Sequence, residues 1–140
     1  MSRIIIGIDA GTHTGFSYTE NGKLQVVKSL RIDEALNEVM RLTAMGNLCQ
    51  FYVKVYLEDA RKSGREHRGQ DAAQGAGSVK RDCNIWEDFL KAHKIDYVLV
   101  SPQSQRKLNK MSAGKFKAMT GWQGRTNEHG RDAAMLVWGR

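Results

Sequence analysis

The first third of the chain carries short apolar runs whose spacing predicts β-strands. Residues 4–9 form a continuous, isoleucine-rich run, which is typical of a strand buried on both faces. Residues 14–19 predict a second strand, and Asn21-Gly22 predicts a tight hairpin into a third strand over residues 23–30. We therefore expect the chain to open with a three-stranded β-meander.

Helical spacing follows this meander. Asp33 is expected to cap a helix that runs to about residue 44, and Gly46 is expected to close it. Four positions at i, i+3, i+4 and i+7 form its core-facing stripe: Leu36, Val39, Met40 and Thr43. Residues 51–58 then predict a strand parallel to the first, because a right-handed crossover would connect the two. Alternation places Val53, Val55 and Leu57 on one face of that strand and Tyr52, Lys54, Tyr56 and Glu58 on the other.

The second half of the chain alternates loops, helices and one more strand. Residues 61–77 are rich in Gly, Arg and polar side chains, and their first half predicts a mobile loop. A helix should follow from about residue 72 or 78 to residue 93, with a core stripe of Val79, Cys83, Trp86 and Leu90. The remaining elements are a strand over 96–100 and helices over 113–120 and from 127 to the C-terminus. The order βββαβαβα predicts an α/β fold with a five-stranded mixed sheet, in a single domain over residues 1–140.

Composition bounds the class of protein. Hydrophobic residues make up 41% and charged residues 26% of the 140 positions, which are ordinary values for a globular domain. No apolar run approaches the ~20 residues that cross a bilayer, and the N-terminus lacks the layout of a signal peptide. A cytoplasmic protein with no membrane partner is therefore expected. Cys49 and Cys83 have no metal-type spacing, so we expect both to be buried free thiols, with a disulfide as the alternative.

Positive charge is concentrated near the C-terminus. The net charge is +7, and residues 101–140 alone hold eight Lys or Arg against two Asp or Glu. No acidic residue lies between Ser101 and Asn127. Such one-sided clustering favours a polyanionic partner, with a solvated basic surface as the alternative.

Two acidic residues end predicted parallel strands. Asp9 follows the first strand and Glu58 ends the fourth, and the carboxyl ends of neighbouring parallel strands meet at one edge of a sheet. Two close carboxylates repel each other, and their oxygen atoms suit Mg²⁺ or Mn²⁺. The alternatives are a turn-forming role for Asp9 and a solvated strand end for Glu58. Asp59 is a rival acid that points to the opposite face.

The last predicted helix adds two further candidate ligands. His129 and Asp132 are three residues apart and so share one helical face, and two alanines after Asp132 would let the helix approach the sheet closely. Burying Asp132 in such apolar company is unfavourable unless something neutralises it. The alternative is that His129 and Asp132 pair with each other or with Arg131. Glu128 is a second candidate for the same face.

The pattern of Asp9, Glu58 and His129-x-x-Asp132 resembles the RuvC-type Holliday-junction resolvases, which have the ribonuclease H-like fold. The resemblance implies that these four residues form a metal-binding catalytic set for two Mg²⁺ or Mn²⁺ ions. It also implies a homodimer that resolves four-way or branched DNA by paired nicks, leaving 5′-phosphate and 3′-hydroxyl ends. The helix over residues 72–90 is the expected dimer interface.

Basic residues near this site are candidates for contacts with DNA phosphates. They are Arg61, Lys62, Arg65, Arg68, Lys80, Arg106, Lys107, Lys110, Lys115 and Lys117. His67, Phe116 and Trp122 are candidates for stacking on bases opened at a branch point. For Phe116 and Trp122, burial in the core is the favoured expectation.

Three other interpretations compete with a junction nuclease. The stretch Asp9-Ala10-Gly11-Thr12 also resembles the first phosphate loop of the ATPase fold shared by actin and hexokinase, but the sequence has no second copy of that loop. A ribonuclease H acting on RNA–DNA hybrids or RNA would use the same metal site. A non-catalytic DNA-binding module of the same fold is favoured by His129, which stands in place of a carboxylate.

Overall fold

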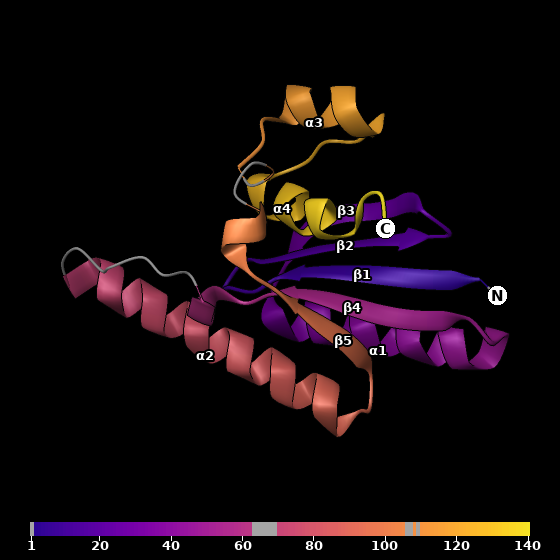
Figure 1. Ribbon diagram of the computed structural model, residues 1–140, viewed down its shortest axis with the longest axis horizontal. Helices are drawn as coiled ribbons and strands as arrows, with labels where there is room; N and C mark the ends of the chain where they lie inside the picture. Colours follow the sequence, from indigo (N-terminus) through magenta and orange to yellow (C-terminus); the bar gives the residue numbers. More distant parts are fainter. Residues whose placement is uncertain (1, 63–69, 106–107, 109) are drawn as a thin grey trace.

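A single mixed sheet organises the described residues. The computed structural model describes the chain except residues 1, 63–69, 106–107 and 109, and for residues 70–76 and 103 it describes the backbone alone. The strands lie in the order β3-β2-β1-β4-β5 (Figure 1): β1 (Arg3–Asp9), β2 (Thr14–Glu20), β3 (Lys23–Leu30), β4 (Tyr52–Glu58) and β5 (Asp96–Val100). β1, β4 and β5 run parallel, whereas β2 and β3 pair antiparallel. The expected five-stranded mixed sheet is confirmed.

Helices cover both faces of this sheet (Figure 1). The helices α1 (Ile32–Cys49) and α2 (Gln70–Ala92) lie on one face. On the other face α4 (Glu128–Val137) packs on β1, β2 and β3, and α3 (Ala113–Thr120) lies beyond α4. Two short 3-10 helices, η1 (Ala60–Lys62) and η2 (Pro102–Gln105), follow β4 and β5. None of the described helices is long and apolar enough to cross a membrane.

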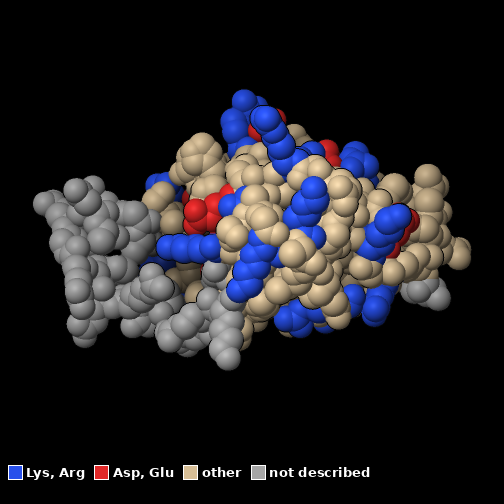
Figure 2. All heavy atoms as spheres, turned by 90° about the horizontal axis from the view of Figure 1, so that it is seen from above, with Lys and Arg blue, Asp and Glu red and all other residues tan. Residues whose placement is uncertain are grey.

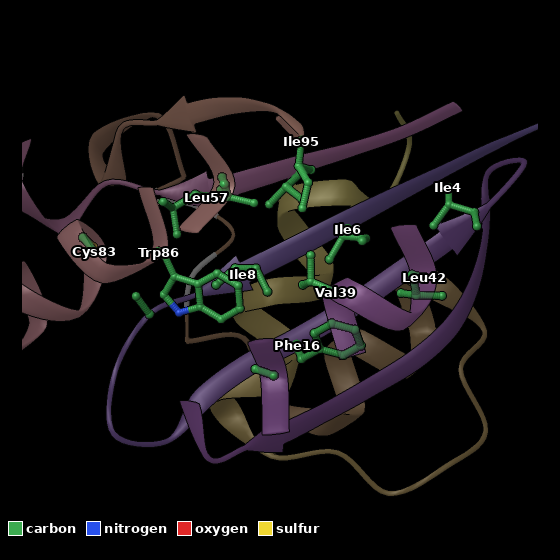
Figure 3. Close-up of a cluster of buried hydrophobic side chains, with 14 residues drawn as sticks. Ile4, Ile6, Ile8, Phe16, Val39, Leu42, Leu57, Cys83, Trp86 and Ile95 are labelled. Atoms are coloured by element: carbon green, nitrogen blue, oxygen red, sulfur yellow. The ribbon is translucent and has the colours of Figure 1, made fainter. Parts of the chain in front are cut away.

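The larger core lies between the sheet and helices α1 and α2 (Figure 3). Ile4, Ile6 and Ile8 of β1 point into it and are fully buried together with Trp86 of α2. Side chains alternate along a strand, so the intervening positions of β1 face the other way. Asp9 consequently faces α4.

Glycines allow α4 to lie directly on the strands. A Cβ at Gly7 of β1 would collide with the carbonyl oxygen of Ala133, and a Cβ at Gly15 of β2 would collide with that of His129. From the helix side, a Cβ at Gly130 would lie 2.9 Å from a backbone nitrogen of β3. These close approaches seat the first half of α4 over the carboxyl end of β1.

The C-terminal end of α1 corrects two expectations. Gly46 does not close this helix, which continues to Cys49. Gly46 is buried instead, and a Cβ there would collide with the side chain of Val53, so this glycine lets α1 pack against β4. Cys49, the last residue of this helix, is exposed, whereas Cys83 is buried as expected; both are free thiols.

The start of α1 also differs from the prediction. Arg31, rather than Asp33, is the N-cap residue, and the side chain of Glu34 accepts a 3.0 Å hydrogen bond from its backbone N–H. Asp33 lies in the first turn, where an acidic side chain is favourable at the positive end of the helix. The helix α2 begins at Gln70, slightly before either predicted start. The predicted loop before it falls largely on residues 63–69, outside the described residues.

Candidate active site

Asp9 and Glu58 are neighbours at one edge of the sheet. β1 and β4 pair in parallel with Ile8 opposite Leu57, so Asp9 and Glu58 are the next residues along adjacent strands. Such strands lie ~4.8 Å apart. Ile8 and Leu57 are both fully buried on the side of α1 and α2, and the acids that follow them therefore face α4. The structure brings the two carboxylates to the same place from positions 49 residues apart in sequence.

Asp132 reaches this edge from α4. Its side chain is buried, and its Oδ1 accepts a 2.8 Å hydrogen bond from the backbone N–H of Lys110. The guanidinium of Arg131, the alternative partner, instead donates to the carbonyl oxygens of Met111 at 2.7 Å and Thr126 at 3.0 Å. Arg131 thus holds together the segments before α3 and α4, and Asp132 keeps its orientation through Lys110.

His129 lies at the outer side of the same cluster. Its Nδ1 is 3.8 Å from Oδ2 of Asp9, and its ring stacks on His13 with centroids 6.0 Å apart. Asn127 caps α4 by accepting a 2.8 Å hydrogen bond from the N–H of Gly130, which fixes the turn that carries His129. The His129 side chain is 49% exposed, so water and substrate can reach the imidazole.

The acids of the cluster oppose one another's ionisation. Burial, followed by repulsion from Glu58, Asp132 and Glu128, raises the pKa of Asp9 from 3.8 to about 8. Burial also raises the pKa of Asp132, although the hydrogen bond from Lys110 partly offsets it. Glu128, the second candidate on this face, is exposed and acts on both aspartates through its charge. Ionisation of all these acids would therefore leave excess negative charge, which a divalent cation would relieve.

The chemistry of this cluster fits a hard divalent cation, because it offers carboxylate oxygens and an imidazole nitrogen. The side chains do not stand as a coordination shell, however. Among the described residues, no three His, Cys, Asp or Glu side chains are close enough together to hold a metal ion. Holding an ion would therefore require side-chain rotation on a backbone that already brings these residues to one edge.

Asp59, the rival acid, is engaged on the opposite side. Its side chain is 2% exposed, and Oδ1 lies 2.7 Å from Nε of Arg61. Arg61 also pairs with Glu87 of α2 at 2.8 Å, and Tyr97 of β5 donates to Glu87 at 2.6 Å. Burial acts to raise the pKa of Asp59, but the hydrogen bonds and charge of Arg61 lower it overall. This network ties β4, α2 and β5 together next to Glu58.

The predicted DNA-contacting residues fall into three groups. The exposed ones are Lys62, Lys110, Lys115 and Lys117, and Lys80 is half-buried. Outside the described residues lie Arg65, Arg68, Arg106 and Lys107. Arg61 is engaged within the fold by its two ion pairs. Figure 2, which views the molecule from the α3 side, shows Lys and Arg side chains around a group of acidic side chains.

The aromatic candidates also divide. Phe116 is buried in a small cluster under α3, as expected, whereas Trp122 is half-buried against the same cluster. His67 lies outside the described residues.

Sequence reasoning missed His13 and the role of Lys110. His13 has no informative spacing to His129, and Lys110 acts through its backbone, which has a left-handed φ of 58°.

The sheet order and its flanking helices define a ribonuclease H-like fold of the kind found in RuvC. No protein-family model matches the chain, and no curated protein matches it. Among solved structures, it is similar to T. thermophilus RuvC in complex with a Holliday junction substrate, with a TM-score of 0.56 at 14% sequence identity. The match covers 97% of this chain and 90% of that chain. At this identity the similarity shows a shared fold.

Proposed function

We propose that this chain is a metal-dependent endonuclease that resolves four-way or otherwise branched DNA by paired nicks, leaving 5′-phosphate and 3′-hydroxyl ends. The observation that carries the proposal is the coupling of Asp9 to Glu58 and Asp132, acids from three separate elements. A partly buried acid with a pKa of about 8 destabilises the fold at neutral pH, and such groups cluster at functional sites. The fold shared with a protein solved on a Holliday junction supports branched DNA as the substrate.

Asp9, Glu58 and Asp132 would hold two Mg²⁺ or Mn²⁺ ions, with His129 as a further ligand or as the group that orients water. When bound, such ions lower the pKa of an attacking water and neutralise charge on the phosphodiester. Asp9 would be the central ligand of this set, because Glu58 and Asp132 both act on it electrostatically. An imidazole nitrogen in the set suits Mn²⁺ somewhat better than Mg²⁺.

Residues around the acids would keep them in position. The N–H of Lys110 fixes one oxygen of Asp132, and Gly15 leaves room for the backbone of His129 above β2. The imidazole of His129 is accessible and 3.8 Å from Asp9, so it can accept a proton from water at this edge. The chain itself would thus supply orientation and proton transfer.

Exposed lysines on the same side would hold DNA phosphates. Lys62 ends η1, the short helix that follows β4 and Glu58, and the backbone N–H of Lys110 is bonded to Asp132. Lys115 and Lys117 extend this surface along α3. Each such contact adds affinity that salt weakens and contributes little sequence preference.

We also propose that the active form is a homodimer, because a four-way junction has two-fold symmetry and needs two cuts. The helix α2 is the proposed interface. Ile85 on this helix is 41% exposed, which is compatible with burial against a second copy.

The decisive experiment compares three substrates. The protein is incubated with a four-way junction, a linear duplex of the same sequence and an RNA–DNA hybrid, each with Mg²⁺, Mn²⁺ or a chelator. We expect paired symmetric nicks in the junction alone, only with metal, and none from Asp9→Asn although this variant still binds the junction. A wild-type cutting rate from Asp9→Asn would place the chemistry elsewhere.

A non-catalytic DNA-binding module is the second candidate, favoured by the absence of a ready three-ligand group among the described residues. It predicts junction binding without cutting at any concentration of either metal. A ribonuclease H would use the same acids, and preferential cutting of the hybrid in the same experiment would identify it.

A further inference from the structure

Two hollows flank the loop that joins α3 to α4. The first, of about 350 Å³, is lined by residues of α3 and the loop: Ala113, Gly114, Phe116, Lys117, Trp122, Gln123, Gly124, Arg125 and Thr126. The second, of about 320 Å³, shares Trp122, Gln123 and Gly124 and reaches β3 at Lys23 and Leu24. Both volumes lie at the small end of the range for ligand pockets. The first hollow is called the Trp122 pocket below.

The charged residues described in the lining of both hollows are all basic. Lys117 and Arg125 line the Trp122 pocket, Lys23 lines the other hollow, and all three side chains are exposed. Among the residues that the structure describes, neither lining includes an Asp or Glu. A ligand of these hollows is therefore expected to be an anion.

Trp122 gives the pocket an aromatic wall. It is half-buried and packs against the cluster that contains Phe116 and Met111. Flat apolar surface beside cations is the combination on which unpaired bases stack.

The pocket adjoins the proposed active site through α4. Thr126 at its rim accepts hydrogen bonds from Arg131, the residue before Asp132, at 2.9 and 3.0 Å. Asn127, the next residue, caps the helix that carries His129. A ligand in the Trp122 pocket would therefore be held against the same rigid segment that presents the acids.

We propose that the Trp122 pocket binds one unstacked nucleotide of a single-stranded or branched nucleic acid, with its base against Trp122 and its phosphate beside Lys117 and Arg125. Bases in an intact duplex are paired and stacked on their neighbours, so only an opened nucleotide can lay its base against Trp122. The inference rests on the proposed function only in the class of ligand, a nucleic acid.

The test measures binding rather than cutting, in chelator and at one low salt concentration. Three fluorescently labelled probes are compared by anisotropy: a single strand, the duplex of the same sequence and a four-way junction. Trp122→Ala is expected to raise the Kd for the single strand and the junction about tenfold, with little change for the duplex. Trp138→Ala is the matched control, because Trp138 is 40% exposed at the far end of α4, and it should leave all three Kd values unchanged.

The double variant Lys117→Gln, Arg125→Gln keeps the aromatic wall and replaces only exposed charges, so it should fold even if Trp122→Ala does not. It should weaken single-strand and junction binding several-fold more than duplex binding. Equal losses on all three probes, or no loss on any, would overturn the pocket assignment. If these preferences appear while metal-dependent cutting does not, the pocket stands and the proposed nuclease function fails. Failure to bind any of the three probes would overturn both.

Discussion

The backbone N–H of Lys110 donates a 2.8 Å hydrogen bond to Oδ1 of Asp132, so a residue of the basic segment orients a candidate metal ligand. Lys110 adopts a left-handed conformation to do so, with φ of 58°. Its side chain is exposed and is available for a DNA phosphate. One residue thus serves the acidic site through its backbone and the proposed DNA surface through its side chain.

These two roles can be separated by substitution. Lys110→Gly retains the N–H and suits a positive φ, so Asp132 should stay oriented while one cation is lost. We expect weaker DNA binding, a salt dependence reduced by about one phosphate contact, and an unchanged cutting rate at saturating junction. Lys110→Pro removes the donor and cannot adopt this φ, so it should reduce the cutting rate itself. Equal cutting rates for the two variants at saturating junction would show that this hydrogen bond does not support the site.

The raised pKa of Asp9 makes stability depend on pH. Its folded pKa of about 8 lies above the ordinary 3.8, so between these values the folded chain holds a proton that the unfolded chain has released. Stability of the metal-free protein should therefore fall as pH rises toward 8, by about 2 kcal/mol between pH 6 and pH 8. Asp9→Asn should flatten this dependence and raise the Tm at pH 8. Thermal unfolding at both pH values in chelator measures it.

Metal should reverse this effect if the proposed site is real. A cation competes with the proton on Asp9, so Mg²⁺ or Mn²⁺ should raise the Tm of the wild type more at pH 8 than at pH 6. Asp9→Asn should show a much smaller metal-induced shift. An identical shift in both proteins would place the metal away from Asp9.

The seating of α4 on the sheet gives a prediction about packing. Gly7→Ala would put a methyl group against the carbonyl oxygen of Ala133 and 3.1 Å from Val137, so α4 must move away from β1. We expect a loss of about 3 kcal/mol in unfolding free energy and loss of cutting, since Asp132 moves with the helix. Gly77→Ala in α2 is the matched control. Nothing lies within 4 Å of its new methyl group, and it should stabilise the helix slightly.

Urea unfolding with circular dichroism compares Gly7→Ala and Gly77→Ala. Equal stabilities for the two variants would mean that the contact between β1 and α4 is looser than the structure indicates.

Arg61 provides a test between a structural role and a role in DNA binding. Arg61→Gln leaves the buried carboxylate of Asp59 without its closest described cation, so we expect a loss of about 2–3 kcal/mol in unfolding free energy. Arg81→Gln is the control, because its side chain is 71% exposed and 3.9 Å from Asp82, and should change stability by less than about 0.5 kcal/mol. Reduced DNA affinity of Arg61→Gln with unchanged stability would instead support the DNA contact.

Much of the fold could be predicted because local pattern and tertiary packing agree. Alternation, a hairpin signal and apolar spacing predicted several elements correctly. These are the strands over 14–20, 23–30 and 96–100 and the helix over 113–120. The end of α1 could not be predicted in this way. Glycine commonly ends helices, but Gly46 lies within α1 and packs against Val53 of β4. A contact with a distant strand overrode a local preference.

The acids of the candidate site could be predicted from the sequence, whereas the groups that support them could not. Asp9 and Glu58 end apolar strands, and Asp132 stands beside alanines, so each is unusual for its surroundings. Arg61 looked like a free cation in sequence, and only the structure pairs it with Asp59 and Glu87. A side chain's partners depend on which distant residues the fold brings near it.

The sequence by itself determined where most of the strands and helices form and which acids are out of place, because periodicity and side-chain polarity are local properties. The tertiary structure alone decided that α4 lies against β1 through Gly7 and Gly15, that Lys110 orients Asp132, and that Trp122 stands between two cationic hollows. Those relationships join residues far apart in the chain, and packing rather than local preference sets the distances between them.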